Sequence, residues 1–346
     1  MLGRTTRLTV KVAALTVAML ASQLVAVALA PAATRLDLQD AAGLPPQGLY
    51  EYCQLGTGPG SLARCEARLA VMSNAGFATV VNYGDLFGSM ANLLAYGRYA
   101  QSLGLTMVWD LDDPSFWGTD GLGGTAALAL YPQMAASCRA GSAACATNAE
   151  LAQWVVGQLK TQPETWMYLI GDEPNLWQAD HPDPAAPQQL QAWGNLIHAA
   201  DPSHATFVVS NEGGSGLPCG NGSAILPFIG TAGVVGGDYY PVYPARPCPV
   251  SGWDTIASAQ QGYVSQFHKS GLVLSVQAFG DGEPDVGLTG PFPTARQMRQ
   301  ERDDILANSS PTAILWYSFF YQSGGAPPRP AWQWNAIRAA AFAPSP

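Results

Sequence analysis

The sequence predicts a single-domain α/β fold, a (β/α)8 TIM barrel with loop insertions. From Gly48 onward, short apolar runs alternate with longer amphipathic segments, and the alternation repeats eight times. Strands that alternate with helices imply parallel pairing, and eight such units close naturally into a barrel. An open doubly wound sheet is the alternative. That fold would want a Gly-x-Gly-x-x-Gly turn at the first strand, and the segment 56–60 (Gly-Thr-Gly-Pro-Gly) has the wrong spacing.

The first four strands are expected where apolar, branched and aromatic residues cluster between turn residues, at 48–53, 77–83, 105–111 and 166–171. Helices should follow at 61–74, around 93–99 up to Gly104, and after Thr147. Thr147 and Glu150 have the spacing of a capping box. A long Gly- and Ala-rich insertion separates the third strand from its helix. The fourth strand must stop at Pro174, because proline cannot continue a ladder.

The second half repeats the pattern. Its strands are expected at 206–210, 233–240, 272–278 and 312–317, and its helices at 187–200, 253–269, 294–306 and 332–342. Gly271 is expected to cap the helix that precedes the seventh strand. The barrel should therefore occupy residues 46–346, after a linker at 33–45.

Residues 1–32 have the features of a secretory signal peptide: basic residues precede an apolar run that ends in small residues at Ala30-Pro-Ala32. An uncleaved membrane anchor is the alternative, because the run is nearly long enough to span a bilayer. Cleavage would remove three basic residues and no acidic ones, so the formal charge would move from −9 to −12. We expect a secreted monomer with no membrane contact after cleavage. Nucleic acid is a poor partner, because no Lys/Arg cluster exists.

Six cysteines follow the predicted cleavage site, and an exported protein meets an oxidising environment, so disulfides are expected. Their order suggests three local pairs, although six cysteines allow fifteen pairings: Cys53–Cys65, Cys138–Cys145 and Cys219–Cys248. Zinc is disfavoured, because no Cys-x-x-Cys occurs and the four histidines are scattered. Neither a metal nor a cofactor is expected.

Polar and aromatic side chains lie at the C-terminal end of almost every predicted strand, where a barrel of this type gathers them on one face. The candidates for substrate binding are Glu51, Asn82, Tyr83, Asp110, Asp172, Asn211, Tyr239, Tyr240, Gln277, Trp316 and Tyr317. The candidates for catalysis are Glu173, Asp238 and Glu212. Turn chemistry alone would also explain Glu212, and the aromatic residues could be plain core.

Glu173 is the strongest of these candidates. It directly follows a buried strand and lies beside a second acid, so partial desolvation and like-charge repulsion should raise its pKa. The segment Gly171-Asp-Glu-Pro-Asn175 resembles the Asn-Glu-Pro signature of clan A glycoside hydrolases, with Asp172 in place of the usual asparagine. The segments 237–241, 276–279, 293–299 and 314–318 resemble a poorly characterised group of glycoside-hydrolase-like barrels. That resemblance implies a carbohydrate ligand and an acid/base role for Glu173.

The resemblance fails at one position. Retaining clan A enzymes carry a glutamate nucleophile at the end of the seventh strand, and this chain has Gln277 there. A two-carboxylate mechanism then needs another partner facing Glu173, with Glu212, Asp238, Asp281 and Glu283 available.

Two functions from different classes follow. The first is a secreted glycoside hydrolase, and the second is a barrel that binds carbohydrate or a cell-wall polymer without cleaving it. A serine hydrolase has little support, because no Gly-x-Ser-x-Gly elbow occurs. Metal-assisted chemistry is disfavoured, because the spacing of Asp110, Asp112 and Asp113 matches no metal-binding pattern. Asp112-Asp113-Pro114 is also a good turn sequence.

Overall fold

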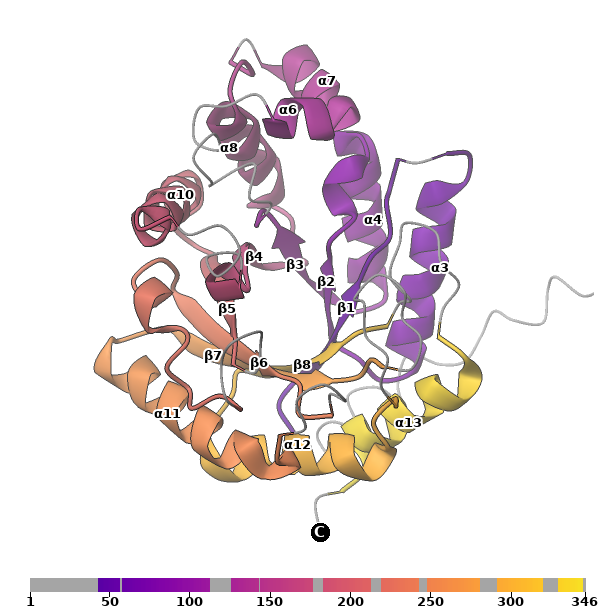
Figure 1. Ribbon diagram of the computed structural model, residues 1–346. Helices are drawn as coiled ribbons and strands as arrows, with labels where there is room; N and C mark the ends of the chain where they lie inside the picture. Colours follow the sequence, from indigo (N-terminus) through magenta and orange to yellow (C-terminus); the bar gives the residue numbers. More distant parts are fainter. Residues whose placement is uncertain are drawn as a thin grey trace, which may run out of the picture.

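The computed structural model is a closed barrel of eight parallel strands in the order β1 to β8, with helices around it (Figure 1). The structure describes residues 43–56, 58–112, 126–142, 144–176, 183–212, 219–242, 248–280, 291–319 and 329–344. The strands are β1 (Gln47–Glu51), β2 (Thr79–Asn82), β3 (Thr106–Asp110), β4 (Thr165–Asp172), β5 (Ala205–Asn211), β6 (Val234–Tyr239), β7 (Gly271–Gln277) and β8 (Ala313–Tyr317). The predicted fold class is confirmed.

Helices follow the strands as the sequence predicts. They are α3 (Ser61–Asn74), α4 (Met90–Ser102), α8 (Asn148–Leu159), α10 (Ala186–Ala200), α11 (Trp253–Gln266), α12 (Ala295–Asn308) and α13 (Ala331–Phe342), with short 3-10 turns at Asp85–Phe87, Leu226–Phe228 and Val250–Gly252. The Thr147–Glu150 capping box is present at the start of α8. A second capping box, Thr294 with Gln297, starts α12.

Two elements differ from the expectation. The insertion after β3 contains two helices, α6 (Ala126–Leu130) and α7 (Pro132–Gly141), and α7 buries Met134, Ala135 and Cys138 on one face. Helix α11 ends at Gln266, three residues early, because His268 adopts a left-handed conformation (φ 51°). Gly271 therefore does not cap that helix; it is the first residue of β7.

The alternation of side chains along each strand separates two hydrophobic layers. The inner layer fills the barrel and consists of Tyr50, Val81, Val108, Met167, Leu169, Phe207, Val209, Val234, Val273, Ala313 and Leu315. The outer layer lies between the strands and the helices and includes Trp109, Tyr168, Tyr239 and Trp316. The layer to which a strand-end residue belongs therefore decides whether its side chain points over the barrel axis or under a helix.

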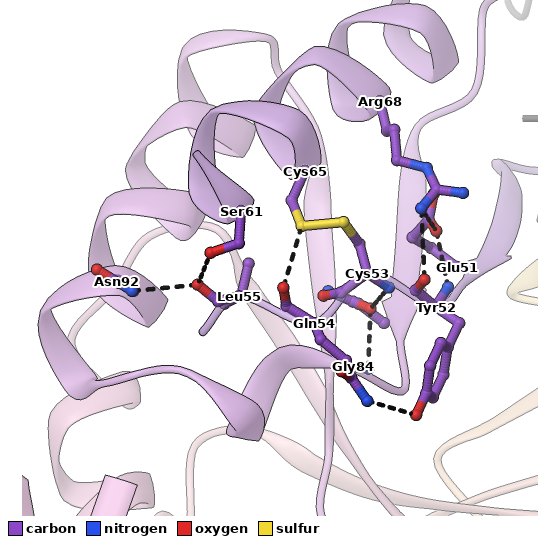
Figure 2. Close-up of a disulfide and its surroundings, with 11 residues drawn as sticks. Glu51, Tyr52, Cys53, Gln54, Leu55, Ser61, Cys65, Arg68, Gly84 and Asn92 are labelled. Atoms are coloured by element: carbon purple, nitrogen blue, oxygen red, sulfur yellow. Dashed lines mark hydrogen bonds and ion pairs between the residues drawn. A yellow bond between two sulfur atoms is a disulfide. The ribbon is translucent and has the colours of Figure 1, made fainter. Parts of the chain in front are cut away.

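All three predicted disulfides are present: Cys53–Cys65, Cys138–Cys145 and Cys219–Cys248. The first ties the chain after β1 to α3, with its Cα atoms 5.6 Å apart. Figure 2 shows Arg68 of α3 beside this disulfide and next to Glu51. Arg68 Nη1 lies 3.4 Å from Glu51 Oε1. Three disulfides suit a protein of an oxidising compartment.

Among the described residues, no helix has both the length and the apolarity needed to cross a bilayer. The predicted signal peptide lies outside the described residues, so it stays a prediction, as do the predicted domain limits.

Candidate active site at the C-terminal rim of the barrel

The C-terminal rim of the barrel brings four carboxyl groups together: Asp110, Asp172, Glu173 and Asp238. We call this set the carboxyl cluster. Asp110 and Asp238 reach the rim by ordinary alternation, two residues after the inner-layer Val108 and four residues after the inner-layer Val234. Strands β3, β4 and β6 therefore supply the cluster.

Asp172 reaches the same side through an irregularity in β4. The pairing of β4 with β5 shifts by one residue between Leu169 and Gly171, so Asp172 pairs with the inner-layer Val209. Such a shift turns the following side chains to the opposite face of the sheet. The hydroxyl of Tyr83 donates to Asp172 Oδ2 at 2.7 Å, which holds the carboxyl over the barrel.

Glu173 has a backbone conformation that is unusual for a residue other than glycine. Its φ is +48°, in the left-handed region, and its N–H still donates to Val209 O at 3.0 Å. Non-glycine residues in this region cost about 1–3 kcal/mol and cluster at functional sites. The turn directs the side chain to Asn211, whose amide nitrogen donates to Glu173 Oε1 at 2.5 Å.

Asn175 holds Asn211 in place. The amide nitrogen of Asn175 donates to Asn211 O at 2.8 Å, and the backbone N–H of Asn211 donates to Asn175 Oδ1 at 2.9 Å. These two reciprocal bonds join the ends of β4 and β5. The orientation of the Glu173 carboxyl therefore depends on the whole Glu173–Asn175–Asn211 arrangement.

Asp238 is the partner of Glu173. Their carboxyl groups lie within hydrogen-bonding distance of each other, and Tyr240 donates its hydroxyl to Asp238 Oδ2 at 2.7 Å. Burial, followed by repulsion from Glu173 and Asp172, raises the pKa of Asp238 well above its usual value. Burial also raises the pKa of Glu173, although the hydrogen bonds from Asp238 and Asn211 oppose the shift. Burial and mutual repulsion therefore favour one proton shared by the pair over two ionised carboxylates.

The other two carboxyl groups are also disposed to be neutral. Burial raises the pKa of Asp172 well above its usual value, and repulsion from Asp112 and Glu173 adds to this shift. Burial raises the pKa of Asp110 to about 7. The buried Asp85 accepts a hydrogen bond from the backbone N–H of Asp110 at 3.1 Å, which supports this end of β3.

Aromatic rings line the rest of the rim. We call Tyr50, Tyr83, Tyr240, Phe279 and Tyr317 the ring cluster. Tyr50 stacks on Tyr83 with 5.5 Å between ring centres and meets Tyr317 edge-on at 5.2 Å, while Phe279 contacts Tyr240 at 4.7 Å and Tyr317 at 5.7 Å. Tyr83, Tyr240 and Tyr317 keep part of their surface exposed, as do Asp172 and Glu173. Flat rings beside hydrogen-bonding groups suit the binding of a sugar.

Gln277 lies at the end of β7, but its side chain is engaged elsewhere. Its amide exchanges hydrogen bonds with the backbone of Val242, 2.9 Å to the N–H and 3.0 Å to the carbonyl, and it also donates to Phe279 O at 3.3 Å. The side chain is 1% exposed. Gln277 therefore braces the segment after β6.

Five predicted site residues lie outside the rim. Glu51 pairs with Arg68, Asn82 binds the backbone of Cys53, Tyr239 donates to Pro249 O, Trp316 donates to Gln47, and Glu212 accepts from Gln260. All five are buried on the helix side of the strands. Asp113, Asp281 and Glu283 fall outside the described residues. The described part of the chain contains no group of three His, Cys, Asp or Glu residues placed to hold a metal ion.

Sequence reasoning missed four residues of the site: Tyr50, Asp85, Asn175 and Phe279. The alternation within the first strand could have found Tyr50, because Glu51 and Tyr50 cannot both face the barrel. Asn175 was visible as an amide two residues after the acid. Asp85 and Phe279 lie beyond the ends of the strands, so the two-residue alternation of side chains along a strand does not predict their orientation.

The barrel resembles solved structures of glycoside hydrolases. A β-glucuronidase of Bacteroides uniformis superposes with a TM-score of 0.52 at 9% identity, over 80% of this chain and 30% of that one. A β-galacturonidase of Eisenbergiella tayi gives 0.54 at 10% identity, over 86% and 50%. The fold is shared with glycoside hydrolases. A β-galactosidase of Halorubrum lacusprofundi gives 0.53 at 15% identity, over 85% and 57%. The chain thus spans between about a third and somewhat over half of these enzymes, and no protein-family model or curated protein matches its sequence.

Proposed function

We propose that this protein is a secreted glycoside hydrolase in which Glu173 is the general acid/base. The observation that carries the proposal is the placement of Glu173 in a left-handed backbone conformation, in contact with Asn211 and Asp238, at the C-terminal rim of a barrel. In TIM-barrel enzymes the active site lies at this face. The secreted location rests on the three disulfides and the predicted signal peptide.

The proton chemistry follows from the Glu173–Asp238 contact. Burial and the neighbouring carboxyl groups favour the protonated form of Asp238, and this proton can be shared with Glu173. When a glycosidic oxygen approaches the partly exposed Glu173, that proton moves across the pair and onto the leaving oxygen. Asn211, which can only donate to Glu173 through its amide nitrogen, favours the proton on the other carboxyl oxygen. The ring cluster supplies the faces against which a sugar ring packs.

A panel of oligosaccharides and chromogenic glycosides tests the proposal. Wild-type protein should release reducing ends from at least one of them, and Glu173→Gln should lower that rate about 10²–10⁴-fold, the usual contribution of a general acid/base. Glu66→Gln, at a partly exposed glutamate of α3, is the matched control and should behave as wild type. Equal turnover by wild type and Glu173→Gln would refute the assignment.

Gln277 favours a second candidate, a barrel that binds carbohydrate without cleaving it. The side chain at the end of β7 is an amide engaged with Val242 and Phe279, where the clan A resemblance would place a nucleophile. In that case glycan arrays should show binding, no panel member should be cleaved, and Glu173→Gln should leave the affinity unchanged.

A further inference from the structure

The chain keeps the side-chain alternation of a strand for several residues beyond the end of β1. We call residues 52–56 the β1 extension. Its buried residues alternate with partly exposed ones: Cys53 and Leu55 are buried, and Tyr52, Gln54 and Gly56 are partly exposed. Tyr52 packs against the inner hydrophobic layer of the barrel, so the exposed side of the extension belongs to the same face as the carboxyl cluster.

The end of β2 holds the extension in place. The side-chain amide of Asn82 takes the place of a ladder partner, because Cys53 N donates to Asn82 Oδ1 at 2.8 Å and Asn82 Nδ2 donates to Cys53 O at 3.0 Å. Leu55 N donates to Gly84 O at 3.3 Å. A Cβ on Gly84 would lie only 2.5 Å from the carbonyl carbon of Cys53, so the two segments approach as closely as a glycine permits.

Two helices hold the extension from the outside of the barrel. The Cys53–Cys65 disulfide joins it to α3. The carbonyl oxygen of Leu55 accepts from Ser61 Oγ at 2.7 Å and from Asn92 Nδ2 of α4 at 3.1 Å, as Figure 2 shows. The buried side of the extension is therefore fixed by β2, α3 and α4.

Tyr52 and Gln54 make up the exposed side. Gln54 Nε2 donates to Tyr52 Oη at 2.8 Å, and Figure 2 shows the Tyr52 ring directed away from α3. The backbone of Tyr52 is also held, since its N–H donates to Glu51 Oε1 at 2.8 Å and its carbonyl accepts from Arg68 Nη1 at 3.4 Å. No described residue donates a hydrogen bond to Gln54 Oε1. An amide and a phenol thus lie side by side on a fixed backbone.

The extension lies across the barrel from the proposed acid/base. In the closed strand order β1 is opposite β5, whose Asn211 binds Glu173. Eight strands spaced about 4.8 Å apart put opposite strands roughly 12–15 Å apart. An extended segment advances about 3.3 Å per residue, so Gln54 lies roughly 13 Å beyond Tyr50 along the chain. A single pyranose ring does not span these distances.

We propose that Tyr52 and Gln54 form a second sugar subsite, which binds an uncharged unit of an oligosaccharide or polysaccharide while another unit of the same chain lies at Glu173. This inference rests on the proposed function. The amide offers a donor and an acceptor and the phenol offers both, which matches neighbouring sugar hydroxyls. The Tyr52 ring adds a flat apolar face. Both side chains are uncharged, so they suit a neutral sugar unit.

The test compares a chromogenic glycoside of one sugar with oligosaccharides of increasing length built from the same sugar. Gln54→Leu keeps the size of the side chain and removes its hydrogen bonds. It should raise KM for the longer oligosaccharides about 3–10-fold and leave kcat, and the KM of the one-sugar glycoside, unchanged. Tyr52→Phe should act in the same direction with a smaller effect, because the ring remains. Gln162→Leu, at a partly exposed glutamine before β4 at the opposite end of the barrel, is the matched control and should behave as wild type.

Binding to the Glu173→Gln variant separates the subsite from catalysis. In calorimetry the affinity should rise with chain length, and adding Gln54→Leu should remove that rise. If Gln54→Leu does not fold, which a thermal melt shows, Tyr52→Phe decides the same question.

The outcomes distinguish the two proposals. Equal changes of KM for the one-sugar glycoside and the long oligosaccharides, or no change for either, would overturn the inference and leave the proposed function intact. Length-dependent binding that needs Gln54, without cleavage by wild type, would refute the proposed function and support the subsite. If no glycan is cleaved or bound, both proposals fail.

Discussion

Glu173 and Glu212 look alike in the sequence and differ in the structure. Each glutamate follows the end of a strand, β4 or β5, and each comes directly after a polar residue and before a turn residue. Glu212 is 0% exposed and accepts hydrogen bonds from Gln260 Nε2 at 2.7 Å and from Gly222 N at 3.0 Å. Glu173 is partly exposed and meets another acid.

The backbone explains the difference. On β5 the alternation continues past Asn211, so Asn211 faces the barrel and Glu212 faces α11. After β4 the same alternation would place Glu173 under a helix, but the left-handed turn at Glu173 returns its side chain to the rim. A buried acid whose oxygens accept from donors has a structural role, whereas a partly exposed acid that contacts another acid is the better candidate for proton transfer.

The largest expected effect is that of Glu173→Gln on catalysis. We expect activity to fall about 10²–10⁴-fold. The thermal midpoint should stay within a few degrees of wild type, because glutamine keeps an oxygen that can accept from Asn211 and removes the repulsion between Glu173 and Asp172. Initial rates and a thermal melt of the same preparation measure both effects. A large loss of stability would place Glu173 in the same class as Glu212.

Glu212→Ala should show the reverse pattern. Removing the carboxylate leaves the buried donors of Gln260 and Gly222 without an acceptor and creates a cavity, so we expect a loss of about 3–5 kcal/mol in the free energy of unfolding. Urea denaturation measures it. Glu212→Gln, which keeps one acceptor oxygen, should lose less. A stable Glu212→Ala with low activity would contradict this comparison.

The pH dependence of the free energy of unfolding should show how far the buried carboxyl cluster destabilises the folded protein when it ionises. Burial raises the pKa of Asp110 from 3.8 to about 7, so the folded state binds a proton that the unfolded state has lost. The contribution of the protonated Asp110 to the free energy of unfolding is complete below about pH 4 and is lost as the pH rises to about 7. The loss is at most about 4 kcal/mol. Unfolding free energies of wild type should therefore fall across this window.

Asp110→Asn is the matched variant for that measurement. Asparagine keeps the oxygen that accepts from the backbone N–H of Asp112 at 3.0 Å, but it cannot ionise. The fall between pH 4 and 7 should be smaller in the variant, and the remaining slope belongs to the other members of the cluster. Identical slopes in both proteins would show that Asp110 titrates at its ordinary pKa.

The sequence predicted the barrel because its signal is repeated eight times, and each period of apolar residues survives small errors in strand limits. It predicted the disulfides because each pair is local in sequence. The site was harder, since a rim position depends on which face a side chain takes. The register shift between Leu169 and Gly171 and the left-handed turn at Glu173 each turn the following side chain to the other face of the sheet. Neither can be recognised from the amino-acid composition of the segment. Tyr239 and Trp316 show the opposite case: their polar ends bind Pro249 and Gln47 behind the strands.

Asn175 gives the smallest effect and the finest test of the comparison. Its two bonds to Asn211 fix the amide that donates to Glu173 Oε1, so it acts on Glu173 through Asn211. Asn175→Ala should lower kcat about 10-fold, or about 1.4 kcal/mol, with little change in KM. The alkaline limb of the pH–rate profile should also move upward, because Glu173 must be protonated to act as the general acid and a weakened hydrogen bond to its ionised form raises its pKa. Asn175→Asp, which keeps the acceptor for the Asn211 N–H, should restore only part of the loss. A change in stability without a change in the pH profile would show that Asn175 only joins the ends of β4 and β5 and does not act on Glu173.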